Sequence, residues 1–402
     1  MNIVAVGQSL IKRDLMNDPN IEFKKVLEKT RAADLSFTNY EGTILGDHGG
    51  WSMKDTFSHA SAPSVLDTLK AMGFNALALS NNHAFDLGPS GILSTLEEVE
   101  KRGFLYAGIG TNKTRAAQPH YLETSKGRVA LLAMDCGPQP DCFYARDADA
   151  FTTDRPGINR QRVIESLKLS LPDLETLRAI SRQTGFDKRQ AEYRRVGFRR
   201  ESPAEEFYGI PVEAGEETIE QRQLDQDDLE RNLSAIEEAS SHADFVIVYV
   251  HHHYWSPVWE ETPAWIQNFA RQCIDCGGNI FVSHGVPLLQ GIEIYKRRPI
   301  FYSLGNFIFH SFRKSTYSRD SLWESVIATC SFEDNGELNG MKLDPVVLGG
   351  SEALLNHALS RDTPQMAGPE SGKKILDSLA QMSMCYNTQI NIQEGKGYLI
   401  IE

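Results

Sequence analysis

The sequence predicts an α/β fold, in which short buried strands alternate with amphipathic helices. Runs of β-branched and other apolar residues recur along the chain, and most are followed by a helical pattern of about ten to fifteen residues. The chain has 402 residues, of which 41% are hydrophobic, enough to form a large buried core. This alternation is typical of proteins that place helices over the faces of a sheet.

The predicted elements follow one another in a regular order. In the first 150 residues, strands are expected at 3–6, 35–38, 76–79 and 129–134. Helices are expected at 20–31, 64–72 and 92–101. The second and third helices stop at Gly73 and Gly103, a common helix C-terminal signal. The pattern returns with strands at 245–250, 280–282 and 300–304 and a helix at 264–276.

Two stretches depart from this alternation. Residues of about 155–240 are helix-prone, polar and charged, and are interpreted as an insertion that forms a cap or a loosely ordered arm. A C-terminal extension of about 323–402 has strand patterns at 325–331 and 341–347 and a helical pattern at 372–384. The chain is therefore predicted to form a single domain, 1–402, that carries an insertion and an extension.

The formal net charge of −13 argues against a protein that coats nucleic acid, which needs a basic face. Most of this charge falls in the insertion, where residues 201–230 hold eleven acidic side chains and one basic one. Just before them, residues 188–200 hold six basic side chains and one acidic one. We expect this charge-split insertion to fold over the catalytic crevice and to select the substrate.

The sequence offers no candidate membrane span. No stretch of about eighteen apolar residues occurs, and the first residues read as a strand without a basic lead. The six cysteines are sparse, and a single Cys-x-x-Cys pair on a helical pattern is weak evidence for a metal or redox site. A cytoplasmic location is expected.

Five predicted strands run directly into polar residues that can bind metals. In α/β sheets, ligands gather at the carboxyl ends of the strands, where loops bring side chains into one crevice. Imidazole, carboxylate and amide groups recur at these ends and together suit a divalent metal ion. The segments are 7–8, 39–42, 80–88, 251–253 and 283–285.

Each of these segments also has a simpler interpretation. A single Glu or His after a strand is usually a solvated or capping residue, and 81–83 could form an Asx-type turn before the next helix. The repeated occurrence of such residues at strand ends favours the metal site over these alternatives.

Three of the motifs resemble a known family. Residues 39–42 read Asn-Tyr-Glu-Gly, residues 80–88 read Ser-Asn-Asn-His-Ala-Phe-Asp-Leu-Gly, and a longer match runs from 291 to 309. These motifs are similar to those of the CapA family, which is associated with poly-γ-glutamate capsule biosynthesis and belongs to the calcineurin-like metallophosphoesterase superfamily. The resemblance implies a four-layer α/β/β/α sandwich with metal bound at one edge.

The resemblance also implies roles for residues of the first half. The superfamily's first motif is Gly-Asp, whose Asp binds the first metal, whereas this chain has Gln8 in place of that Asp. Glu41 takes the place of the metal-bridging carboxylate. Asn82 matches a metal ligand, His83 a general acid or oxyanion contact, and Asp86 is placed to orient the His83 ring.

In the second half, His251 and His284 match metal ligands, and His253 is expected on the same side as His251. The second His of the last motif falls at 286–287, where Val and Pro cannot bind metal. Both departures affect the first metal. We therefore expect a single divalent ion, one of Mn, Fe, Zn, Mg or Ca, held by Glu41, Asn82, His251 and His284.

Three functions remain open at this point. The first is metal-dependent hydrolysis of a peptide-like, carboxylate-rich or phosphorylated substrate. The second is metal-assisted epimerisation at a peptide α-carbon, since a lasso-peptide epimerase is similar in fold. The third is a non-catalytic assembly role in polymer synthesis. The candidate acid/base residues are His83, Asp86, His253 and Asp14, with His284 a further option, and the candidate substrate contacts are Gln8, Asn39, Arg155 and Trp255.

Overall fold

The structure is a computed structural model that describes residues 1–55, 57–199, 205–310, 319–348, 363–399 and 401. It divides into two compact units. The main unit comprises Met1–Gln161 and Asp227–Glu402, and the inserted unit comprises Arg162–Gln226. Each unit is described by itself.

The main unit is built on two sheets. The first sheet has the order β23-β24-β21-β20-β1-β2-β5-β6, with β19 and β22 at its side. Its strands are β1 (Asn2–Leu10), β2 (Leu35–Tyr40), β5 (Ala76–Ala78), β6 (Leu105–Ala107), β19 (Asn306–Phe309), β20 (Glu324–Phe332), β21 (Leu338–Val347), β22 (Gln365–Met366), β23 (Ile390–Gln393) and β24 (Lys396–Leu399).

The second sheet has the order β17-β18-β16-β15-β9-β8. Its strands are β8 (His120–Thr124), β9 (Gly127–Asp135), β15 (Phe245–His251), β16 (Ile280–His284), β17 (Ile292–Tyr295) and β18 (Arg298–Phe301). Short strand pairs join β3 (Thr43–Ile44) to β4 (Ala60–Ser61) and β7 (Ile109–Gly110) to β10 (Gly157–Ile158).

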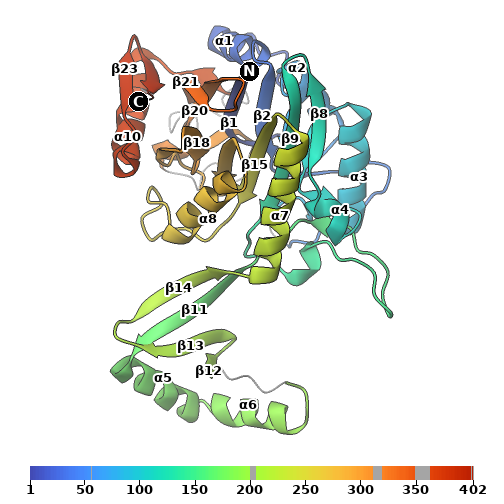
Figure 1. Cartoon of the computed structure of the whole chain (residues 1–402). Helices are drawn as coiled ribbons and strands as arrows, with labels where there is room; N and C mark the ends of the chain where they lie inside the picture. Colours follow the sequence, from blue (N-terminus) through green and yellow to red (C-terminus); the bar gives the residue numbers. More distant parts are fainter. Residues whose placement is uncertain (56, 200–204, 311–318, 349–362, 400, 402) are drawn as a thin grey trace. The chain divides into compact units, whose positions relative to one another are not determined.

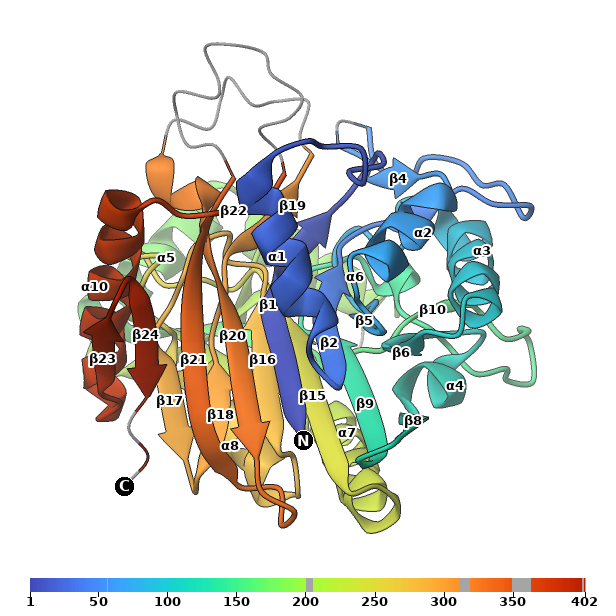
Figure 2. The ribbon, with the colours of Figure 1, turned by 90° about the horizontal axis from the view of Figure 1, so that it is seen from above.

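The two sheets pack face to face. Figure 2 shows β21, β20, β1 and β2 lying over β18, β16, β15 and β9. Between them lies one buried apolar cluster, in which the rings of Phe37 and Tyr249 are 5.8 Å apart and those of Phe245 and Phe332 are 4.6 Å apart. These strands are buried on both faces and rich in Val, Ile and Phe, as expected for central strands of an α/β sheet.

Helices cover the two outer faces (Figures 1 and 2). Phe23 and Val26 of α1 and Leu66 of α2 belong to a second apolar cluster with Val4 and Val6 of the first sheet. On the second sheet, Phe269 of α8 packs against Phe281 of β16. The helices of the main unit are α1 (Ile21–Arg31), α2 (Ser64–Ala71), α3 (Gly88–Lys101), α4 (Lys113–Ala117), α7 (Gln226–His242), α8 (Ala264–Asp275) and α10 (Pro369–Ser383).

The predicted α/β/β/α sandwich is therefore confirmed by the layers of the main unit. The C-terminal extension contributes β20, β21, β23 and β24 to the first sheet, and Ile375 and Leu376 of α10 join the core between the sheets. None of the helices in the described part of the chain has the length and apolar character that a bilayer span requires.

β1 changes partners within the first sheet. Its first half pairs with β20 and its second half, from Gln8 onward, pairs with β19, with an irregularity at Gln8. At Gly7 a Cβ atom would come within 2.3 Å of the Gly305 carbonyl oxygen, so only glycine allows this close approach. This close approach holds β1 beside Gly305, which directly precedes β19.

The inserted unit is a small α+β structure. Its sheet has the order β12-β13-β11-β14, with β11 (Val163–Ser170), β12 (Glu205–Phe207), β13 (Ile210–Gly215) and β14 (Ile219–Leu224). Two helices, α5 (Leu171–Gln183) and α6 (Phe186–Arg195), accompany it, and its core is formed by Leu169, Leu174 and Val212. The helix-prone pattern thus corresponds to two helices, while the charged stretch after residue 204 contains three strands.

Candidate metal centre

The polar residues predicted at strand ends lie together at one edge of the main unit. His251 is the last residue of β15 and His284 the last of β16, and the two are direct neighbours in the parallel ladder. From the first sheet, Glu41 follows β2, and its backbone N–H donates to the Ser9 carbonyl oxygen at 3.1 Å. Parallel strands end at the same edge, which brings these side chains together.

One cluster in the described part of the chain has the spacing of a metal site. Ligand atoms of Glu41, His251 and His253 lie within 4.8 Å of one another. The Nε2 atoms of His251 and His253 are 3.1 Å apart. Two imidazole nitrogens bound to one ion at about 2.1 Å would lie roughly 3.0–3.4 Å apart, so this separation fits shared coordination.

Electrostatics favour a cation at this cluster. Burial lowers the pKa of His253 and of His284 to about 3 and that of His251 well below its usual value, so the rings are neutral and their lone pairs are available. Burial raises the pKa of Glu41 to about 8, because its carboxylate lies away from solvent near the acidic groups of Asp86 and Asp135, with the charge of Lys54 as a partial offset. A divalent ion would stabilise the ionised form.

Ligand atoms around the cluster are left without hydrogen-bond partners. They include Glu41 Oε2, Asn82 Oδ1 and both ring nitrogens of the buried His284. Orphaned buried polar atoms are costly unless a missing partner satisfies them. The donor set of carboxylate, amide oxygen and imidazole nitrogen fits Mn, Fe or Zn. The residues present therefore fit a divalent metal.

His83 stands beside this cluster with a supported orientation. Its Nδ1 donates to Asp86 Oδ2 at 2.7 Å, and Asp86 also accepts from the His59 backbone N–H at 2.6 Å and pairs with Lys54 at 2.9 Å. Burial alone would raise the pKa of Asp86, but His83, Lys54 and this N–H together lower it. Because Asp86 binds Nδ1, the Nε2 atom of His83 is the ring nitrogen left for proton exchange.

A cavity of about 760 Å³ opens next to the cluster. Gln8, Glu41, Asn82, His83, His253 and Trp255 line it, together with Leu10, Phe57, Pro257, Val258, Trp259, Glu260, Gly285, Pro287, Phe309, Arg319 and Leu322. Six of the candidate residues thus share one cavity.

Gln8 lines the cavity, but its amide is already hydrogen-bonded. Its Nε2 donates to Asn306 Oδ1 at 2.9 Å, and its Oε1 accepts from the Gly285 N–H at 3.2 Å. Gln8 therefore ties β1 to the loops after β16 and before β19, at the position where the family pattern has a metal-binding Asp.

Six candidate residues do not line this cavity: His251, His284 and Asp86, described above, and Asn39, Arg155 and Asp14. Asn39 is fully buried and accepts from Asn81 Nδ2 at 3.1 Å. Arg155 donates to the Tyr144 carbonyl oxygen at 3.0–3.1 Å. Asp14 is exposed and accepts from the Met16 N–H at 2.9 Å.

Three further residues of the site lie outside the predicted set. Asp135 ends β9 beside His251, accepts from Tyr144 OH at 2.8 Å, and has a pKa raised by burial to about 7. Asp135 could have been found from the sequence, because, like the predicted residues, it is a polar residue at the end of a buried strand. Asn81 supports the loop by donating to the Tyr40 carbonyl oxygen at 2.8 Å. Lys54 lies in a loop and has no comparable sequence signal.

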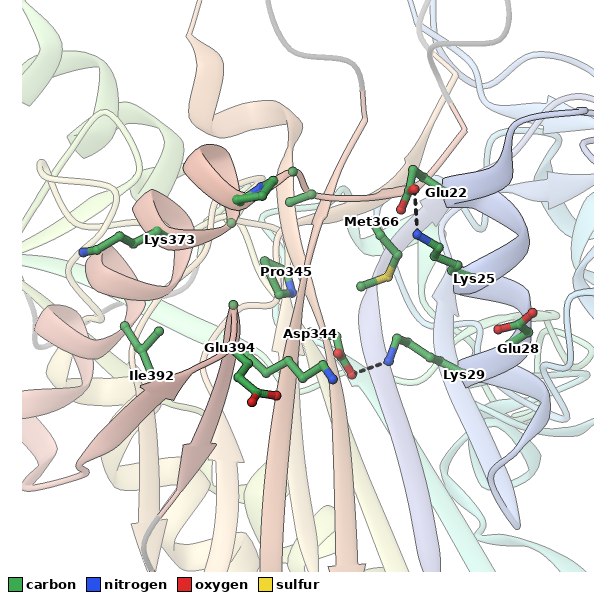
Figure 3. Close-up of a pocket in the computed structure, with 16 residues that line it drawn as sticks. Glu22, Lys25, Glu28, Lys29, Asp344, Pro345, Met366, Lys373, Ile392 and Glu394 are labelled. Atoms are coloured by element: carbon green, nitrogen blue, oxygen red, sulfur yellow. Dashed lines mark hydrogen bonds and ion pairs between the residues drawn. The ribbon is translucent and has the colours of Figure 1, made fainter.

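A second cavity of similar volume lies between α1 and the C-terminal segments, and half of its lining residues are charged (Figure 3). Lys29 pairs with the buried Asp344 at 2.9 Å, and Lys25 pairs with Glu22 at 2.8 Å. Its described lining contains no histidine, whereas the cluster of potential metal ligands, Glu41, His251 and His253, lies at the first cavity.

Comparison with known proteins assigns the family. The model of the family described as bacterial capsule synthesis protein PGA_cap matches residues 2–311. Two uncharacterised proteins of Sinorhizobium fredii, y4sH and y4uA, are each 31% identical over 449 residues, covering 99% of this chain and 92% of the relative. The PGA biosynthesis protein CapA of Bacillus subtilis is 40% identical over 296 residues, covering 72% of this chain and 57% of that protein.

A 5'-nucleotidase precursor from Thermus thermophilus aligns with a TM-score of 0.38 and 11% identity over 97% of this chain and 60% of that one, a likeness too weak to carry an argument. The family match covers both sheets of the main unit up to β19 and all the residues of the metal cluster. The chain therefore belongs to the bacterial capsule synthesis protein family PGA_cap, the CapA family that its motifs resemble.

Proposed function

We propose that this protein is an enzyme that binds one divalent metal ion through Glu41, His251 and His253, with Asn82 and His284 completing the ligand set. The observation that carries this proposal is the cluster of buried ligand atoms, which lie within 4.8 Å of one another and open into a cavity. A buried carboxylate beside neutral imidazoles is costly by itself, and a cation offsets that cost.

The reaction that we propose is hydrolysis of a peptide-like, carboxylate-rich or phosphorylated substrate. A divalent ion in this cluster would supply a Lewis acid for a carbonyl or phosphoryl oxygen. His83, held through Nδ1 by Asp86, presents Nε2 as the group that gives or takes a proton in the cavity. The names of the CapA relatives, which refer to capsule and PGA biosynthesis, support a peptide-like substrate.

A single ion is proposed rather than two. In this chain the amide of Gln8 is committed to Asn306 and Gly285, and Val286 and Pro287 stand where a second histidine ligand would be needed. Both differences remove charge or donor atoms from a second position.

Metal analysis of protein dialysed against chelator and reloaded tests the proposal. We expect one tightly bound ion per chain, lost in Glu41→Gln and His251→Ala, together with hydrolysis of at least one member of a panel of peptide amides and phosphoesters. Two tightly bound ions would overturn the single-ion assignment. Unchanged metal content in both variants would overturn the site itself. If cells that carry His284→Ala show the same phenotype as wild-type cells, this result would support the non-catalytic assembly role in polymer synthesis.

A second candidate is epimerisation at a peptide α-carbon. It is favoured by one observation, that two imidazoles, His83 and His253, line the same cavity. In this candidate Glu41, Asn82, His251 and His284 would hold the ion, and His253 would not be a ligand. One of His83 and His253 would then remove the α-proton and the other would return a proton to the opposite face, with no net change in atoms or electrons. Deuterium uptake from solvent at the α-carbon without cleavage distinguishes this reaction from hydrolysis. A cytoplasmic location stays a prediction that cell fractionation would test.

A further inference from the structure

The cavity beside the metal cluster has two chemically different parts. Its polar floor holds Glu41, Asn82, His83 and His253. The rest of its described wall is mostly apolar and includes Leu10, Phe57, Trp255, Trp259, Phe309 and Leu322. A substrate that reaches the floor must therefore place another part of itself against this wall.

The aromatic part of the wall is held in position. Two of its rings come from the segment between β15 and α8, in which Trp255 and Trp259 pack edge to face with centroids 4.6 Å apart. Trp255 also lies against the His253 ring at 5.1 Å, and its Nε1 donates to the His252 carbonyl oxygen at 3.2 Å. The Trp259 backbone carbonyl accepts from Gln290 Nε2 at 2.7 Å. This wall is thus continuous with the metal cluster through His253.

Charge along the described lining disfavours a polyanionic chain. The charged side chains that line this cavity are Glu41, Glu260 and Arg319, and Arg319 pairs with Glu260. A carboxylate-rich segment lying along this wall would lose hydration against tryptophan and phenylalanine rings without an unpaired lysine or arginine among the described lining residues. The second cavity is more highly charged, with four lysines and four acidic side chains among its described lining residues.

We propose that the substrate carries an apolar group, an aromatic ring or a branched aliphatic chain, next to the bond that reacts, and that Trp255 and Trp259 select this group. The inference rests on the proposed function and narrows it to substrates whose reacting end is apolar. Aromatic rings offer a large contact area and prefer edge-to-face or offset packing, which this pair of tryptophans provides.

Three hydroxamates with one metal-binding head and different tails test the inference on the metal-loaded full chain. They are acetohydroxamate, phenylacetohydroxamate and glutamic acid γ-hydroxamate, with affinity measured by calorimetry. We expect the phenyl compound to bind at least about tenfold more tightly than the other two. In Trp259→Ala this preference should fall by at least about threefold, whereas Trp51→Ala, a matched change at an 85% exposed tryptophan that does not line the cavity, should preserve it.

The outcomes separate this inference from the proposed function. The inference is overturned if the glutamyl compound binds as tightly as the phenyl compound or more tightly, or if the preference for the phenyl compound is unaffected by Trp259→Ala. Metal-dependent binding of all three compounds would still support the metal site. If no hydroxamate shows metal-dependent binding, the metal site fails. In that case the affinities of phenylacetate and glutarate for the apolar wall are compared by tryptophan fluorescence quenching. Tighter binding of phenylacetate supports the inference, and equal binding of the two acids overturns it.

Discussion

Metal binding at the cluster should be coupled to the release of a proton from Glu41. Burial raises the pKa of this carboxyl to about 8 in the metal-free protein, while the pKa values of His253 and His284 are lowered to about 3. Between pH 6 and pH 8 the histidines are therefore already neutral, and Glu41 is the ligand that must lose a proton. Protons and metal compete for the carboxylate, so affinity should fall as the pH falls.

The size of this effect follows from the pKa. With a value of about 8, about 1% of the Glu41 side chains are ionised at pH 6 and about half at pH 8, so the apparent affinity should rise roughly 50-fold between these pH values. Above about pH 9 the affinity should level off, because Glu41 is then ionised before the metal binds.

Isothermal titration calorimetry in two buffers with different ionisation enthalpies measures both the affinity and the number of protons released. We expect close to one proton released at pH 6, falling to about half at pH 8. Glu41→Gln should bind the metal more weakly and should lose this pH dependence. Wild-type affinity that stays constant from pH 6 to pH 8 would refute the assignment of Glu41 as a buried ligand.

Three further predictions concern the scaffold. Phe37→Ala, in the core between the sheets, should lower the free energy of unfolding by about 3–5 kcal/mol in urea titrations, whereas Ile21→Ala, at a 62% exposed position, should change it by less than about 0.5 kcal/mol; equal losses would contradict the packing described. Lys54→Met should cost about 1–3 kcal/mol of unfolding free energy, because it leaves the buried Asp86 without its ion pair, and Lys54→Arg should recover much of this loss; no change in Lys54→Met would count against the pair. Replacing 162–226 by a short glycine linker, feasible because β11 and β14 are paired neighbours, should preserve metal affinity within about twofold and alter substrate affinity; unchanged turnover kinetics would end the idea that the insertion selects substrate.

The sequence indicated which candidate residues would lie near one another better than it indicated the contacts that each of them makes. Polar residues after buried strands indicated where side chains would meet, because parallel strands of one sheet end at a common edge. Within 251–253, side chains alternate, so that His251 and His253 share one side while His252 packs against Trp265 with ring centroids 5.0 Å apart. β15 ends at His251, and the alternation continues for two residues beyond it, so this pair could be anticipated from the i, i+2 spacing.

Other candidate residues make hydrogen bonds to groups both near to and far from them in the chain. Asp14 accepts hydrogen bonds from Met16 and Thr68, and Arg155 donates to carbonyl groups in its own region. Such bonds decide whether a polar side chain reaches a cavity, and no local pattern reveals them. Lys54 likewise pairs with a carboxylate 32 residues further along the chain, through a loop that has no periodicity.

The inserted unit shows a different limit. Four of the eight residues of β11 and four of the six residues of β14 are polar, and both strands are only partly buried, so they lack the clear apolar/polar alternation of a half-buried strand. The apolar residues that define its core, Leu169, Leu174 and Val212, come from three separate elements. Composition alone favoured helix in this region, whereas pairing between β11, β13 and β14 determines the observed sheet.

The change of partners along β1 has a consequence for synthesis of the protein. β1 leaves the ribosome long before its late partners, because one of its edges is completed only by β19 and β20, about 300 residues further along the chain. At about 5–20 residues per second, this strand waits for roughly 15 to 60 seconds with one row of backbone groups unpaired. Exposed strand edges attract other chains. The nascent protein should therefore depend on chaperones until its first strand acquires these late partners, and shortening the chain before β19 should make it prone to aggregate.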